Sequence, residues 1–211
     1  MNRKSLQTEC WLAEHDSAHY ILAYGSLLNR DSRQRHSNMF STGIATRVSG
    51  FERGWYTRAY HESQTYVGAT PNHSGSLNAQ LLPVDLNPSF QTREQDYRFV
   101  NVPCDALSFT DNVDDEKRLR EALSHAELWI CETLKILPAD EAYPVSQSYI
   151  DTCLAGCLEH GGETEAQCFI DTTTHWEHPR KADRQAPVYP RFGKVDNDAT
   201  TIIDRLLGMI G

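Results

Sequence analysis

The feature that most restricts the fold of this chain is a succession of short β-branched or aromatic segments in its first two-thirds. Each segment ends at turn residues, which is typical of strands. The predicted strands cover residues 20–24, 43–49, 54–60, 65–70, 78–84, 97–102 and 127–133. Because no long helix separates them, we expect antiparallel pairing, and such a set can close into a small barrel without exposed edges. The stretches 71–75 and 110–116 are predicted surface loops.

The last third of the chain is predicted to be helical. A capping-box sequence begins at Ser148, and apolar residues then recur at helical spacing until Gly161-Gly162, where the helix is expected to end. A second box at 164–167 and an apolar pattern near 198–207 predict two more helices, and a short one is expected at about 88–94. We therefore expect a single α+β domain over residues 1–211, with the barrel at about 19–135 and the helical part at about 146–208.

Composition excludes several classes of function. A formal net charge of -9 and a pI near 5.4 argue against nucleic-acid binding, which requires basic faces. Residues 1–14 lack the apolar core of a signal peptide, and no stretch approaches the roughly 20 apolar residues that span a bilayer. We expect no membrane contact and a cytoplasmic location.

The cysteines and histidines do not indicate a metal site. The six cysteines form no CxxC pair and no dense disulfide pattern, and the nine histidines form no HExxH or HxH pattern. We expect reduced thiols, with Cys153 and Cys157 packed in the core, and neither a metal nor another cofactor.

An apolar strand that stops abruptly at Tyr24-Gly25-Ser26-Leu27 is the first candidate for a functional site. A glycine at this point can adopt backbone angles closed to other residues and turn successive N–H groups toward a carboxylate or an oxyanion. Read without further context, a strand followed by Gly-Ser is also an ordinary turn.

This turn resembles the signature loop of the γ-glutamylcyclotransferase superfamily, including its ChaC-type and AIG2-like branches. The family's second mark, a glutamate shortly before a tyrosine-containing strand, is similar to Glu94 followed by Tyr97, although Gln91 stands where aspartate is usual and no glycine follows Glu94. Further similarity covers residues 142–150 and 157–162, and later Trp176 and residues 187–191.

The resemblance implies a cofactor-free enzyme that releases 5-oxoproline from a small γ-glutamyl molecule, when the substrate's own α-amine attacks its γ-carbonyl. It implies that Glu94 is the general acid/base. It also implies that Tyr24, Gly25, Ser26 and Leu27 bind the γ-glutamyl group, either at its α-carboxylate or at the oxyanion, and we add Tyr149 as a further substrate-binding residue. A monomer and a homodimer are both compatible with the sequence.

Two alternatives remain open. The chain could be a γ-glutamylamine cyclotransferase that acts on a modified lysine or a small amine, or a catalytically silent ligand-binding module on the same fold. Nucleophilic catalysis by Ser26 is disfavoured because the GxSxG elbow is missing. Arg30, Arg33 and Arg58 could attract an anionic peptide, although exposed arginines are common.

Overall fold

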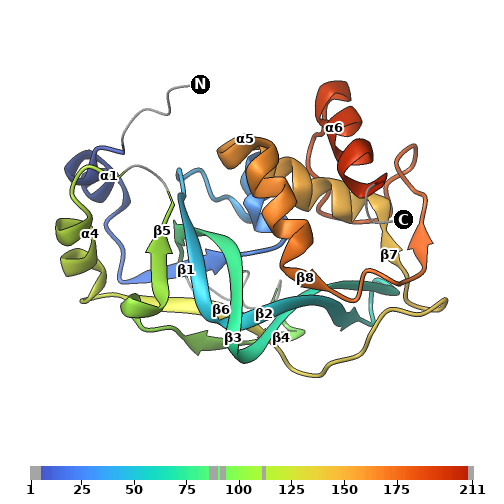
Figure 1. The fold of residues 1–211 in the computed structure, drawn as a ribbon, viewed down its shortest axis with the longest axis horizontal. Coiled ribbons are helices and arrows are strands. Elements are labelled where there is room, and N and C mark those ends of the chain that lie inside the picture. Colours follow the sequence, from blue (N-terminus) through green and yellow to red (C-terminus); the bar gives the residue numbers. More distant parts are fainter. Residues whose placement is uncertain (1–5, 86–89, 91–93, 111–112, 209–211) are drawn as a thin grey trace.

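The computed structural model describes residues 6–85, 90, 94–110 and 113–208 of the chain (Figure 1). Its helices are α1 (Thr8–His15), η1 (Ser26–Leu28), α2 (Arg30–Ser37), η2 (Cys104–Ala106), α4 (Glu116–Leu123), α5 (Gln147–Asp171) and α6 (Asn197–Gly208). Its strands are β1 (His19–Ala23), β2 (Ile44–Ala59), β3 (Gln64–Pro83), β4 (Tyr97–Asn101), β5 (Leu107–Phe109), β6 (Glu127–Thr133), β7 (Val145–Ser146), β8 (Thr173–Thr174) and β9 (Arg180–Lys181). The mixture of a large sheet and several helices confirms the α+β class.

A sheet in the order β4-β6-β1-β3-β2-β5 forms the body of the fold, and β8 also pairs with β2. Most neighbours are antiparallel, but β1 and β6, β2 and β8, and β3 and β6 pair in parallel. The predicted barrel is wrong, because the edge strands β4 and β5 do not pair with each other within the described residues. These edge strands are only five and three residues long. An open sheet leaves backbone N–H and C=O groups unpaired at its edges, and short edge strands keep the number of such groups small.

Four of the predicted strands belong to one long hairpin: those at 43–49 and 54–60 merge into β2, and those at 65–70 and 78–84 merge into β3. β2 and β3 have 16 and 20 residues and stay paired from Ala59 opposite Gln64 to Ile44 opposite Leu81. The prediction that a loop at 71–75 separates two strands is therefore wrong, because these residues are part of β3, although they are largely exposed. The register shifts there opposite Gly50, whose φ of 87° is the left-handed conformation that glycine tolerates best.

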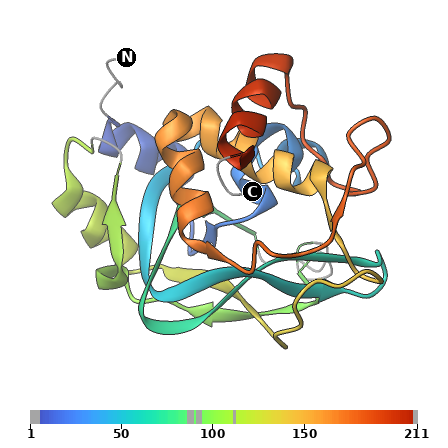
Figure 2. The same ribbon diagram turned by 45° about the vertical axis from the view of Figure 1, so that its right-hand side comes forward.

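Helices α5 and α6 lie over one face of the sheet, and the rotated view in Figure 2 keeps them on that side. Helices α1 and α4 lie together away from them, joined by an ion pair between Arg118 and Glu9. In the buried core, the Trp55 ring of β2 contacts the rings of Tyr149 and Phe169 on α5.

Helices α1, α2 and α4 were not predicted, because each has only eight residues and few of them are apolar. The buried residues of α2 are Ser32 and Arg33, and those of α4 are Leu119 and Leu123. α4 also begins inside the predicted loop 110–116, of which residues 111–112 fall outside the described part. The predicted helix at 88–94 lies mostly outside it as well.

The start of α5 is capped differently from the prediction. The helix begins at Gln147, and Ser148 donates its backbone N–H to Asp183 at 2.8 Å and its hydroxyl to the other oxygen of that carboxylate. The capping box at Ser148 is therefore wrong, because a loop carboxylate from 35 residues further along satisfies these donors.

The C-terminal third is helical only in part. Gly162, with a φ of 65°, breaks the helical backbone inside α5, as the Gly161-Gly162 pair predicted. Residues 172–196 then run as loops with the short strands β8 and β9 before α6 begins. Cys153 and Cys157 are fully buried free thiols in α5, which confirms their predicted core position.

No helix in the described part of the chain combines the length and apolar character needed to cross a membrane.

Candidate active site

A cavity of about 420 Å³ opens at the end of β1. It brings together all six residues that the sequence analysis selected, from three distant parts of the chain. Its lining consists of residues 21–27 and 94–97 together with His36, Ala59, His61, Glu62, Tyr66, Val67, Cys131, Tyr149, Tyr189 and Arg191.

The turn after β1 needs glycine for space. Gly25 has a φ of -126° and a ψ of -135°, so it does not adopt the left-handed conformation. A Cβ at this position would instead come within 3.0 Å of the Val67 side chain and 3.1 Å of the Tyr149 hydroxyl. The turn then continues into η1, where the Leu28 N–H donates to the Gly25 carbonyl at 2.9 Å.

Tyr24 ties two strands together at the cavity wall. Its hydroxyl donates a short hydrogen bond to the Cys131 carbonyl of β6 and accepts one of 3.1 Å from the Ala69 N–H of β3. Burial raises the pKa of Tyr24 well above its ordinary value, so the hydroxyl stays protonated. The ring therefore lines the cavity while its polar end is engaged within the protein.

A cluster of three tyrosines forms part of the cavity wall. The ring centroid of Tyr149 lies 4.5 Å from that of Tyr66 and 4.7 Å from that of Tyr189. The Tyr189 hydroxyl donates to the Oγ of Ser26 at 2.6 Å, and the Tyr66 hydroxyl donates to the Glu62 carboxylate. Burial raises the pKa of both Tyr149 and Tyr66, which keeps these hydroxyls neutral.

Glu94 is partly buried and lines the cavity just before β4. Its N–H donates to the Phe90 carbonyl at 3.2 Å, and its own carbonyl accepts from the Tyr97 N–H at 3.0 Å. Burial is the main cause that raises the pKa of Tyr97 and Tyr24, and the charge of Glu94 contributes to both. The carboxylate of Glu94 thus lies near these two hydroxyls.

Charged side chains of both signs also line the cavity. Arg191 pairs with Glu62 at 2.8 Å, and both side chains are about a quarter exposed. Burial and then the charge of Glu62 raise the pKa of the Asp96 carboxyl. Arg58 lies elsewhere and pairs with Asp140, and neither Arg30 nor Arg33 lines this cavity.

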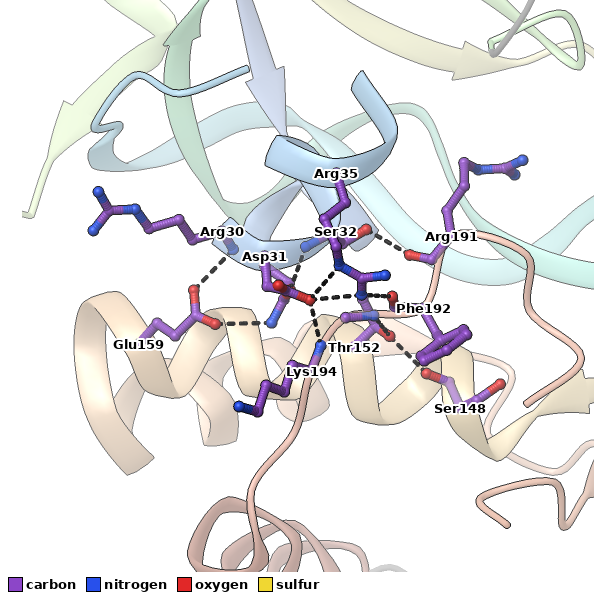
Figure 3. Close-up of polar contacts among 12 residues, drawn as sticks. Arg30, Asp31, Ser32, Arg35, Ser148, Thr152, Glu159, Arg191, Phe192 and Lys194 are labelled. Atoms are coloured by element: carbon purple, nitrogen blue, oxygen red, sulfur yellow. Dashed lines mark hydrogen bonds and ion pairs between the residues drawn. The ribbon is translucent and has the colours of Figure 1, made fainter. Parts of the chain in front are cut away.

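Tyr189, Arg191 and Glu62 were not selected from the sequence. Tyr189 and Arg191 reach the cavity because the segment that follows them is bound between α2 and α5 (Figure 3). The bonds run from Ser32 Oγ to the Arg191 carbonyl (2.6 Å), from Arg35 to the Phe192 carbonyl (2.7 Å), from the Gly193 N–H to Thr152 (3.0 Å) and from the Lys194 N–H to Asp31 (2.7 Å). The family-like stretch at 187–191 was the signal that could have identified Tyr189 and Arg191.

No protein-family model matches the sequence, and no curated protein matches it. Solved structures do match. A γ-glutamyl cyclotransferase aligns over 89% of this chain and 98% of its own, with a TM-score of 0.55 and 12% identity. An uncharacterized protein from Homo sapiens aligns over 88% of this chain and 97% of its own, with a TM-score of 0.52 and 12% identity.

YkqA from Bacillus subtilis aligns over 82% of this chain but 60% of its own, with a TM-score of 0.53 and 11% identity. The chain therefore spans less than two-thirds of that protein. Together these similarities show that the chain has the γ-glutamyl cyclotransferase fold. The resemblance stated from the turn and from Glu94 is confirmed at the level of the fold.

Proposed function

We propose that this protein is a γ-glutamylcyclotransferase-type enzyme that releases 5-oxoproline from a small γ-glutamyl peptide or amide. The observation that carries the proposal is the cavity, which gathers Glu94 and the turn from Tyr24 to Leu27 within the fold of a γ-glutamyl cyclotransferase. A cavity of about 420 Å³ also suits a small molecule, since ligand pockets are roughly 300 to 1,000 Å³.

The reaction requires mainly positioning and proton transfer. The α-amine and the γ-carbonyl belong to one molecule, so holding the substrate in a folded conformation brings the reacting atoms together. Glu94 accepts a proton from the α-ammonium group, the freed amine attacks the γ-carbonyl carbon, and the C–N bond to the leaving group breaks. Glu94 delivers this proton to the leaving nitrogen as its C–N bond breaks. The second proton that the attacking nitrogen loses on forming the lactam passes to the released amine, which leaves as an ammonium group.

The test is detection of 5-oxoproline after incubation of the purified protein with glutathione, several γ-glutamyl dipeptides and γ-glutamyl-lysine. Glu94→Gln keeps the shape of the side chain and removes the base, so we expect a folded protein without turnover. Glu121→Gln, at an exposed position on α4, is the matched control and should keep full turnover.

Each outcome has a distinct meaning. A preference for γ-glutamyl-lysine over the dipeptides would identify a γ-glutamylamine cyclotransferase. Full turnover by folded Glu94→Gln would refute the acid/base role of Glu94. Binding of these compounds without any product would favour a silent ligand-binding module.

A further inference from the structure

Two buried arginines lie behind the turn that follows β1. Arg53 of β2 is 0% exposed and Arg33 of α2 is 4% exposed. Burial lowers the pKa of each to about 10, so both remain protonated at neutral pH. Within the described residues neither guanidinium makes an ion pair with a carboxylate, although the charge of Glu159 favours the protonated form of Arg33.

Arg53 holds the start of the turn. One of its terminal nitrogens donates to the Tyr24 carbonyl at 3.0 Å. The other hydrogen bonds of its guanidinium go to Asn78, Phe169, Thr172 and Thr173. The guanidinium also lies 3.7 Å from the centroid of the Phe169 ring. Its donors are therefore directed by several fixed acceptors, which leaves the group little freedom to move.

Arg33 holds the end of the same turn. One terminal nitrogen donates to the carbonyls of Leu27 and Leu28 at 3.3 and 2.9 Å, and the other donates to the Ser41 carbonyl at 3.3 Å. The carbonyls of Leu27 and Leu28 are the last two of η1, so Arg33 caps the C-terminal end of this short helix. The two arginines thus bind carbonyl oxygens at both ends of one short segment.

The planar trans peptide transmits this arrangement to the cavity. The carbonyl and N–H of one peptide unit point in opposite directions, so a guanidinium on the Tyr24 oxygen directs the Gly25 N–H to the other side. Gly25 lines the cavity and Arg53 does not. The Gly25 N–H therefore points away from the Arg53 guanidinium, on a residue that lines the cavity.

We propose that Arg53 and Arg33 are positioning residues that orient and polarise the Tyr24–Leu28 turn for the α-carboxylate of the substrate. This inference rests on the proposed function. A permanent buried charge favours a permanently charged group, and a carboxylate carries its charge throughout substrate binding. Loss of either arginine should accordingly weaken binding more than it slows the chemical step.

The kinetic test compares Arg33→Met and Arg53→Met with Arg33→Lys. We expect KM for a γ-glutamyl dipeptide to rise about tenfold in each Met variant with a smaller change in kcat, and Arg33→Lys to recover part of the loss. Arg120→Met is the matched control, because Arg120 also donates to two backbone carbonyls, those of Cys104 and Leu107, and does not line the cavity. It should lose stability and keep its KM.

A second test does not need turnover. Tyr24-Gly25 is the single Tyr-Gly pair in the sequence, so labelling with ¹³C-carbonyl tyrosine and ¹⁵N-glycine isolates the Gly25 amide signal. We expect 5-oxoproline to move this signal, while 2-pyrrolidinone, the same ring without the carboxylate, leaves it in place. In Arg33→Met the 5-oxoproline concentration needed should rise about tenfold.

The outcomes separate this inference from the proposed function. Suppose that the wild type makes 5-oxoproline and that both Met variants keep its KM and its Gly25 response. The inference is then refuted and the function stands. If Arg53→Met does not fold, Arg33→Met alone decides this outcome. If no substrate is turned over but the Gly25 response to 5-oxoproline still depends on Arg33, the function falls and the positioning role stands. Absence of both product and response refutes both.

Discussion

The hydroxyl of Tyr189 donates a hydrogen bond of 2.6 Å to the Oγ of Ser26, although 163 residues separate the two in the chain. Both side chains are buried, so water competes little for this bond. It joins the segment before α6 to the turn after β1. The wall of the cavity therefore depends on a contact between the two ends of the sequence.

Replacing Tyr189 with phenylalanine removes this bond and keeps the aromatic ring. We expect Tyr189→Phe to lose about 1 kcal/mol of stability and to raise KM for a γ-glutamyl substrate, because the turn is less firmly held. Urea denaturation and steady-state kinetics measure the two effects. The control is Tyr20→Phe, which removes a buried hydroxyl that donates to the His15 carbonyl at 2.8 Å. A wild-type KM in Tyr189→Phe would contradict the prediction.

Gly25→Ala should destabilise the protein by about 1 to 3 kcal/mol, because the new methyl group would press on Val67 and on the Tyr149 hydroxyl. Adding Tyr149→Phe removes one of these obstacles, so the double variant should recover part of the stability. Thermal unfolding of the single and double variants measures this. Gly208→Ala is the control, since a Cβ there meets no atom within 4 Å. Additive losses in the double variant would show that the Tyr149 hydroxyl is not the obstacle.

Asp183→Ala should reduce both stability and substrate affinity. Its carboxylate accepts from the Ser148 N–H at the start of α5 and from the Val188 N–H beside Tyr189, each at 2.8 Å. We expect a loss of about 1 to 2 kcal/mol in chemical denaturation and a higher KM. Asp196→Ala removes a comparable acceptor for the Ala199 N–H of α6 and should keep KM unchanged. Equal KM values in the two variants would argue against a link between Asp183 and the cavity.

His178 should make the protein less stable in mild acid. Burial lowers its pKa from an ordinary value of 6.5 to about 4, so the unfolded chain takes up a proton more readily than the folded one. The stability contributed by neutral His178 is complete above pH 6.5 and is lost as the pH falls toward 4. His178→Gln should flatten this part of the profile of urea midpoint against pH, and His125→Gln, at an exposed position, should not. An unchanged slope in His178→Gln would exclude this histidine as the cause.

Strands with strong local pattern were predictable almost to the residue. β6 occupies the predicted residues 127–133, and β1 and β4 differ from their predictions by one residue. Helix α2 was not predictable, because it buries Ser32 and Arg33 instead of an apolar stripe. Polar residues are buried there because backbone carbonyls of η1 and a loop accept their hydrogen bonds, and a one-dimensional pattern does not contain those partners.

The selected site residues were local motifs, and the structure places all of them on one cavity. Tyr189, Arg191 and Arg53 escaped selection because each acts through a partner far away in the sequence, such as Ser26, Glu62 or the Tyr24 carbonyl. Gly25 was selected for its backbone freedom, and only the structure shows that Val67 and Tyr149 leave little room for a side chain there.

The sequence by itself determined the α+β class, most strands, and the turn and glutamate that mark the candidate site, because these depend on periodicity and on short motifs. The tertiary structure alone decided that the sheet stays open, that Asp183 caps α5, and that two buried arginines bind the carbonyls of one turn. These features depend on hydrogen bonds between groups that only folding brings within 3 to 4 Å of each other.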